Sequence, residues 1–118
     1  MANTNNPLIA NSVLFTATDL AEVAVAIKAS SAVVYQIEVD NTANAAASYL
    51  RLWNTGTVTV GTTAPDFVLL IPASVSRALT IPQGLTFGTA LTAACVTTAG
   101  TAGLTGPTSD VIVRIVYV

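Results

Sequence analysis

The sequence predicts one all-β domain, an antiparallel β-sandwich of jelly-roll-like type, preceded by an extended N-terminal arm. Short apolar segments recur along the chain at intervals of about ten residues, as in sandwiches and barrels. Several of these segments alternate between apolar and polar residues, which is the period of a half-buried strand. Proline, glycine and small polar residues separate the segments and favour turns. We expect the arm over residues 1–11 and the sandwich domain over residues 12–118.

The N-terminal part is predicted to contain the arm and two weak strands. Residues 1–11 are rich in asparagine, contain Pro7 and lack periodicity, so no regular element is expected there. Weak strands are predicted over residues 13–18 and 22–28. A helix that starts near Thr18 is the alternative for the second segment. Its valines and isoleucine alternate with alanine and lysine, which favours a strand.

The central part carries the strongest strand signals. Residues 33–40 alternate, with apolar side chains at the odd positions predicted on one face and polar side chains at the later even positions on the other. The next predicted strand covers residues 49–54, and its two leucines share one face. The opposite face of that strand carries Tyr49, Arg51 and Trp53.

The C-terminal half is predicted to supply the remaining strands. Residues 67–71 are a continuous apolar run, short enough for a strand that is buried on both faces. Residues 75–81 and 112–118 each alternate around an arginine, and weaker strands are predicted over residues 57–60 and 89–98.

Proline and glycine mark where these strands are expected to end. Because proline cannot donate to a central ladder, the strand at 75–81 is predicted to stop before Pro82. Residues 97–110 hold three glycines and a proline among threonine and alanine, which predicts a long surface loop. The last strand is apolar on both faces, so we expect it to be central in its sheet or buried at an interface.

The composition excludes several kinds of function. Only 8% of the residues are charged, four basic and six acidic, against roughly a quarter in an ordinary domain. Four scattered basic residues are too few for binding along a phosphate backbone, so no nucleic-acid partner is expected. The chain has no histidine and one cysteine, which excludes a Ser-His-Asp triad, an internal disulfide and the common zinc sites. No apolar run approaches the roughly 18 residues of a membrane span, so no membrane anchor is expected.

The remaining candidates for chemistry have simpler interpretations. Glu38 and Asp40 share a strand face and are the residue types that act as acid and base in glycoside hydrolysis, but a solvated strand face is favoured. Residues 40–44 offer oxygen atoms without the spacing of a calcium loop, so an Asx turn is expected. Cys95 is expected to be a small core residue. We therefore predict no catalytic residue, no metal and no cofactor.

The excess of apolar residues predicts a partner. The chain is 53% hydrophobic, more than a monomer of this size is expected to bury, and large apolar patches mark interaction sites. We expect a homo-oligomer, with a trimer favoured over a dimer. Tyr49, Arg51 and Trp53 allow three interpretations: packing within the sheet, an interface anchor, or a platform for stacking a sugar.

Four segments follow one another in a recognisable succession: Val39–Asn44, Tyr49–Asn54, Val60–Asp66 and Ile81–Phe87. In rhythm and composition, residues 33–118 resemble small all-β structural proteins of tailed-bacteriophage virions, of the head decoration or cement type. The resemblance implies a non-enzymatic protein that binds the major capsid protein or another virion protein on the outer surface of the head and stabilises the shell. Such a protein is made in the host cytoplasm and ends up on the virion.

The arm is the main candidate for contact with the shell, because a segment that orders on binding can reach a neighbouring lattice. A tail-fibre or baseplate module that recognises a receptor or a carbohydrate is the alternative function. The candidate contact residues are Asn5, Asn6, Pro7, Leu8 and Ile9 in the arm, and Tyr49, Arg51 and Trp53 on the strand at 49–54.

Overall fold

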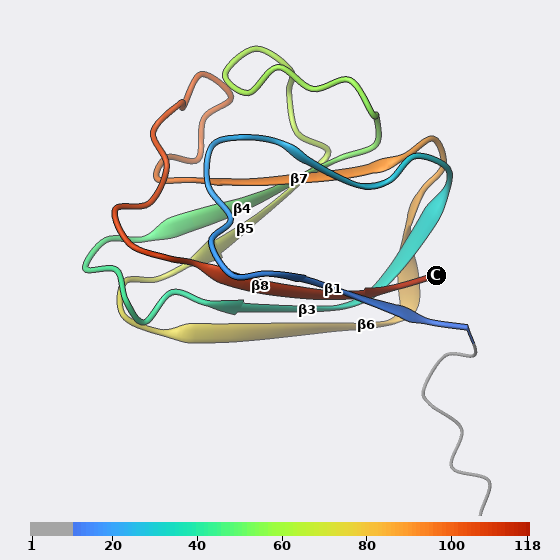
Figure 1. Cartoon of the computed structure of the whole chain (residues 1–118), viewed down its shortest axis with the longest axis horizontal. Helices are drawn as coiled ribbons and strands as arrows, with labels where there is room; N and C mark the ends of the chain where they lie inside the picture. Colours follow the sequence, from blue (N-terminus) through green and yellow to red (C-terminus); the bar gives the residue numbers. More distant parts are fainter. Residues whose placement is uncertain (1–10) are drawn as a thin grey trace, which may run out of the picture.

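The computed structural model describes residues 11–118 and contains eight strands and no helix in that range. The strands form two antiparallel sheets of four that lie face to face (Figure 1). Within the described range there is also no helix of the length and apolarity that a membrane crossing requires. The strands are β1 (Val13–Ala17), β2 (Val25–Lys28), β3 (Ala32–Asp40), β4 (Ser48–Trp53), β5 (Phe67–Ile71), β6 (Ser76–Phe87), β7 (Leu91–Val96) and β8 (Ile112–Tyr117).

The strand order is that of a jelly roll. Sheet A has the order β1-β8-β3-β6 and sheet B the order β2-β7-β4-β5. The antiparallel pairs β1–β8, β2–β7, β3–β6 and β4–β5 are those of one long hairpin rolled into two sheets. The predicted fold class is therefore confirmed, and so is the central position of the last strand, which lies between β1 and β3.

The hydrophobic core lies between the two sheets. Sheet A contributes Ile37 and Ile115, and sheet B contributes Leu50, Leu52 and Ile71, all with no exposed surface. These side chains stand at alternate positions of their strands, so one face of each sheet is apolar and packed. The core fixes the two sheets relative to each other, and the outer sheet faces and the sheet edges lie outside it.

The predicted faces of β3 were wrong in the first half of the strand. Val34 is fully buried, whereas Val33 and Tyr35 are only half-buried. The register of β3 against both of its neighbours shifts between Val34 and Gln36, as at a β-bulge. A bulge inserts one residue and exchanges the faces that follow it, so a strict period of two fails there.

The predicted end of the sixth strand before Pro82 was also wrong. β6 continues to Phe87 because it is an edge strand, where proline needs no ladder partner. Its register against β3 jumps from Thr80 to Leu85, so Pro82 lies in an unpaired bulge. Gly84 in this bulge has a φ of 79°, a conformation that favours glycine.

β5 was predicted to be buried on both faces, and this was wrong as well. Leu69 and Ile71 are buried, but Val68 and Leu70 are 38% and 42% exposed. β5 is the edge strand of sheet B, so one of its faces and its outer edge lie open. The weak strand predicted over residues 57–60 is part of the loop between β4 and β5.

Candidate interaction surface

The outer faces of the two sheets differ. Loops lie beyond the outer face of sheet B, whereas no loop of residues 11–118 lies over the outer face of sheet A (Figure 1). Two of these loops are held to sheet B by side chains of β4. We call the segment 54–66 the β4–β5 loop and the segment 97–111 the β7–β8 loop.

Arg51 holds the β7–β8 loop. Its side chain projects from the outer face of sheet B and has no exposed surface. Its Nη2 donates to the carbonyl oxygens of Thr98, at 2.8 Å, and Gly100. Its Nη1 donates to those of Thr101 and Gly103, at 3.3 and 3.4 Å. Burial lowers the pKa of Arg51, but an arginine stays protonated in proteins, so the loop encloses a cation.

Trp53 is covered by the β4–β5 loop. The indole has no exposed surface, and its Nε1 donates to the carbonyl oxygen of Thr63 at 3.0 Å. Of the three aromatic and basic residues predicted on this strand face, Arg51 and Trp53 therefore contact loops of their own chain, and Tyr49 is half-buried. Packing within the chain accounts for the first two, which present no surface to a partner in this conformation. The arm residues Asn5, Asn6, Pro7, Leu8 and Ile9 lie outside the described residues.

The two carboxylates on β3 are occupied by their own neighbours. Glu38 forms an ion pair with Arg114 of β8 at 3.0 Å, and both side chains are nearly half exposed. Asp40 accepts hydrogen bonds from the hydroxyl and the backbone N–H of Thr42, at 2.6 and 2.9 Å. These bonds lower the pKa of Asp40. The expected Asx turn after β3 is therefore confirmed.

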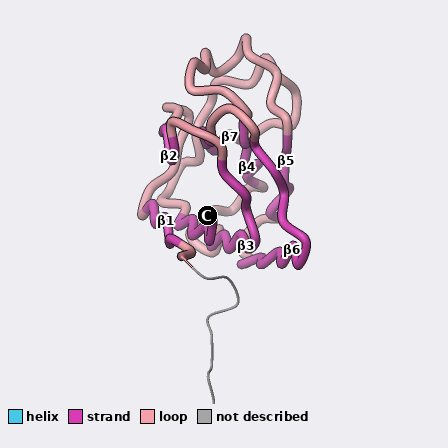
Figure 2. Tube along the Cα trace, turned by 90° about the vertical axis from the view of Figure 1, so that its right-hand side faces the viewer, coloured by secondary structure: helices cyan, strands magenta, loops and turns pink. Residues whose placement is uncertain are grey.

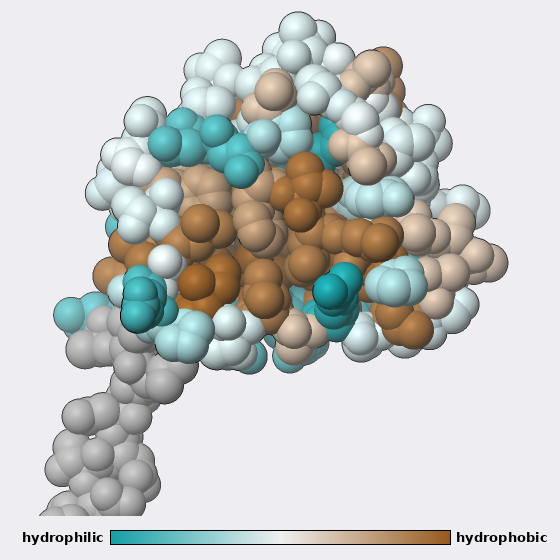
Figure 3. All heavy atoms as spheres, turned by 180° about the vertical axis from the view of Figure 1, so that it is seen from behind, coloured by the Kyte–Doolittle hydropathy of each residue, from teal (hydrophilic) through white to brown (hydrophobic). Residues whose placement is uncertain are grey.

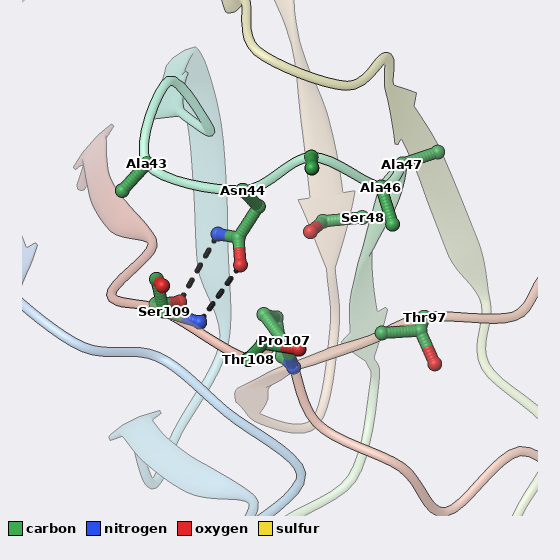
Figure 4. Close-up of a pocket in the computed structure, with 10 residues that line it drawn as sticks. Ala43, Asn44, Ala46, Ala47, Ser48, Thr97, Pro107, Thr108 and Ser109 are labelled. Atoms are coloured by element: carbon green, nitrogen blue, oxygen red, sulfur yellow. Dashed lines mark hydrogen bonds between the residues drawn. The ribbon is translucent and has the colours of Figure 1, made fainter.

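A pocket of about 310 Å³ lies at one end of the sandwich, between the segment 43–48 and the β7–β8 loop. Asn44 ties the two segments together, because its Nδ2 donates to the Ser109 carbonyl at 3.0 Å and its Oδ1 accepts from the Ser109 N–H at 2.8 Å (Figure 4). The lining consists of alanine, proline and small polar side chains. It offers no aromatic ring for stacking a sugar and no charged group among the residues that line it.

Sequence reasoning placed Asn41 only in the turn at residues 40–44 and did not predict that its side chain fastens the same end of the sandwich. The side chain is fully buried, and its Nδ2 donates to the carbonyl oxygens of Ala46, at 3.1 Å, and Pro72, at 3.0 Å. Its Oδ1 accepts from the Ser48 hydroxyl at 2.8 Å. Asn41 also donates to the carbonyl oxygen of Ile71, thirty residues further along the chain. No local sequence pattern could have shown a role that depends on such a distant segment.

Cys95 is buried on β7 with no exposed surface, which confirms its prediction as a core residue. Burial raises the pKa of its thiol to about 12. Because the thiolate is the reactive form, we expect the native protein at pH 8 to react with a soluble thiol reagent far more slowly than the protein unfolded in urea. The reaction is measured by the change in absorbance of the thiol reagent. Rapid modification of the native protein would contradict the burial of Cys95.

Apolar side chains are exposed at both edges of the sandwich. We call the first group, which lies on β1, β2 and their connection, the β1–β2 flank: Val13, Leu14, Val23 and Val25. We call the second group, which lies on β5 and the turn after it, the β5–β6 flank: Val68, Leu70 and Val75. Figure 3 shows the face of the molecule on the β5–β6 side, where apolar side chains gather in a continuous band. Sequence patterns could not reveal the flanks, because the topology decides which strands become edges.

Comparison with known proteins gives no family for this chain: no family model and no curated protein matches it. Residues 11–118 contain no group of three or more cysteine, aspartate or glutamate side chains placed to hold a metal ion.

Proposed function

We propose that this chain is a non-enzymatic structural protein of a bacteriophage particle that attaches to the outer surface of the head and stabilises the shell. The observation that carries the proposal is the difference between the two sheets. Much of sheet B is covered by loops that Arg51 and Trp53 hold in place, whereas the outer face of sheet A, which we call the bare face, is covered by no loop of residues 11–118. One side of the molecule is thus available for a broad contact. The resemblance of residues 33–118 to virion proteins agrees with this role.

One row of the bare face consists of short side chains and a neutralised ion pair, and Leu14 and Asp40 lie on the same face in neighbouring rows. One row across sheet A consists of Thr16, Arg114, Glu38 and Ala78, which are in register on four neighbouring strands. Glu38 and Arg114 neutralise each other within this row. A shell subunit can cover this row without leaving an unpaired charge buried, which would weaken the contact strongly.

The described chain begins at an edge of sheet A. Residues 1–10 join the described chain at Asn11, directly before β1, which is an edge strand of sheet A. Arm and bare face can therefore engage one partner. Many copies that each add a modest contact would stabilise a shell strongly, because the shell subunits are already held in one lattice.

Two variants test the proposal in a co-sedimentation assay with isolated phage heads. Deletion of residues 1–11 and the substitution Ala78→Glu are each expected to leave the sandwich folded and to weaken attachment at least about tenfold. The second change places a carboxylate beside Glu38 on the bare face. Ala102→Glu, in the β7–β8 loop, is the matched control and is expected to bind as the unaltered chain does.

Attachment that survives both changes, with circular dichroism showing folded protein, would refute this role for sheet A and the arm. The alternative function, a tail-fibre or baseplate module that recognises a receptor or a carbohydrate, would instead use the pocket beside Asn44. Association with tails alone would favour that alternative.

A further inference from the structure

The two apolar flanks lie on opposite sides of the molecule. β1 and β2 are the edge strands on one side, and β6 and β5 are the edge strands on the other (Figure 2). Val23 on the first flank is 72% exposed, and Leu70 on the second is 42% exposed. A contact related by a two-fold axis would bury one flank twice and leave the other in water. A head-to-tail contact buries both flanks in a single interface.

The charges at one end of the flanks are complementary. Ala17 of β1 and Arg77 of β6 lie in the same row of sheet A, at its two edges. Asp19 and Glu22, both exposed, follow Ala17 in the connection to β2. Arg77 is exposed on the opposite flank, where its Nη1 donates to the Leu70 carbonyl at 2.6 Å. Acidic groups on the first flank therefore stand level with a basic group on the second.

The other end of the flanks carries the reverse arrangement. Lys28 pairs with Leu91 at the edge of sheet B that belongs to the β1–β2 flank. Asp66 lies at the opposite edge of sheet B. Its backbone N–H donates to the carbonyl oxygen of Leu52, which places Asp66 at the same end of the sheet as Lys28. A basic group on the first flank thus stands level with an acidic group on the second. Apolar centres with opposite charges at both ends are the features that make an interface specific.

We propose that copies of this chain associate head to tail, with the β1–β2 flank of one copy against the β5–β6 flank of the next. Residues at the same level meet when the rotation axis runs along the strands, so Asp19 faces Arg77 and Lys28 faces Asp66. Repeated about that axis, such heterologous contacts close into a ring when the rotation between copies divides a full turn, and a ring is the arrangement that we propose. The arrangement leaves the outer face of sheet A free. It goes beyond the proposed attachment to a shell and does not depend on it.

Two single-flank variants of the full chain test the arrangement by light scattering coupled to gel filtration. Val23→Arg blocks the first flank and Val68→Arg blocks the second, and each variant alone is expected to be a monomer of 12.0 kDa. An equimolar mixture is expected to form a one-to-one dimer, because each variant keeps the flank that the other needs. The unaltered chain is expected to form a ring, and Leu104→Arg, on an exposed loop, is the control that keeps it.

The charges provide a second test that does not depend on the apolar variants folding. Asp19→Arg and Arg77→Asp are each expected to raise the dissociation constant about fivefold, and the two together in one chain to restore it. Three results would overturn the proposal: a monomeric unaltered chain, a single-flank variant that associates as the unaltered chain does, or a folded mixture that stays monomeric. The first would leave attachment to a shell as a separate question, answered by the co-sedimentation assay.

Discussion

Replacing Arg51 with methionine is expected to lower the free energy of unfolding by about 2–4 kcal/mol and to release the β7–β8 loop from sheet B. The guanidinium donates to four carbonyl oxygens of that loop, and no other side chain in the described part of the chain holds residues 98–103 in this way. Methionine fills the space of the aliphatic stem, so the variant removes the hydrogen bonds and the charge with little loss of packing. Urea unfolding and amide hydrogen exchange of residues 98–103 measure the two effects.

The matched control is Arg51→Lys. Lysine keeps the charge, but its single ammonium group cannot reach all four carbonyl oxygens that the two terminal nitrogens of the guanidinium reach. We therefore expect a loss of stability between those of the methionine variant and the unaltered chain. If the methionine variant were as stable as the unaltered chain, with equally slow exchange in the loop, then the loop would be held by something other than Arg51.

The second large effect is expected at Trp53. Trp53→Ala removes a fully buried ring and should lower the free energy of unfolding by about 3–5 kcal/mol. Trp53→Phe keeps most of the ring but loses the hydrogen bond from Nε1 to Thr63, so a smaller cost of about 1–2 kcal/mol is expected.

Unfolding of both variants is followed by far-UV circular dichroism, because the chain has one tryptophan and each variant lacks it. In the unaltered chain the emission of Trp53 should shift to longer wavelength on unfolding. A native emission already typical of tryptophan in water would contradict the burial of this ring beneath the β4–β5 loop.

Local sequence patterns predicted the fold class because the alternation of apolar and polar residues shows which face of a strand is buried and which meets solvent. The alternation in β4 was predicted, and its leucines do lie in the core. The same reasoning failed for β5, because a continuous apolar run does not distinguish a strand buried on both faces from an edge strand with one exposed face. It failed at Pro82 for a related reason: whether proline is tolerated depends on the strand being at an edge, which the topology decides.

The candidate surface was harder to predict than the fold. Arg51 and Trp53 were grouped as a shared strand face, which is where β4 places them. Their burial depends on loops that return across sheet B from residues 63 and 98–103, and no spacing along the chain encodes such a return. The composition did indicate excess apolar surface, and the described residues show part of it on the two flanks.

The low charge of the sequence, 8% of all residues, was the first indication of a partner. The distribution of those charges is now more informative than their number. Glu38 and Arg114 neutralise each other on the bare face of sheet A, and Arg51 is enclosed by a loop. In the proposed head-to-tail contact, the charged groups at the flanks, among them Asp19 and Arg77, would meet those of another copy.

The most direct test of the proposed role is to purify phage particles from a culture in which this chain is produced, to separate their heads from their tails, and to measure which fraction carries the protein. Quantitative mass spectrometry of the two fractions is expected to find the protein with the heads, in many copies for each particle. Its presence on tails alone, or its absence from both fractions, would contradict a role in stabilising the shell.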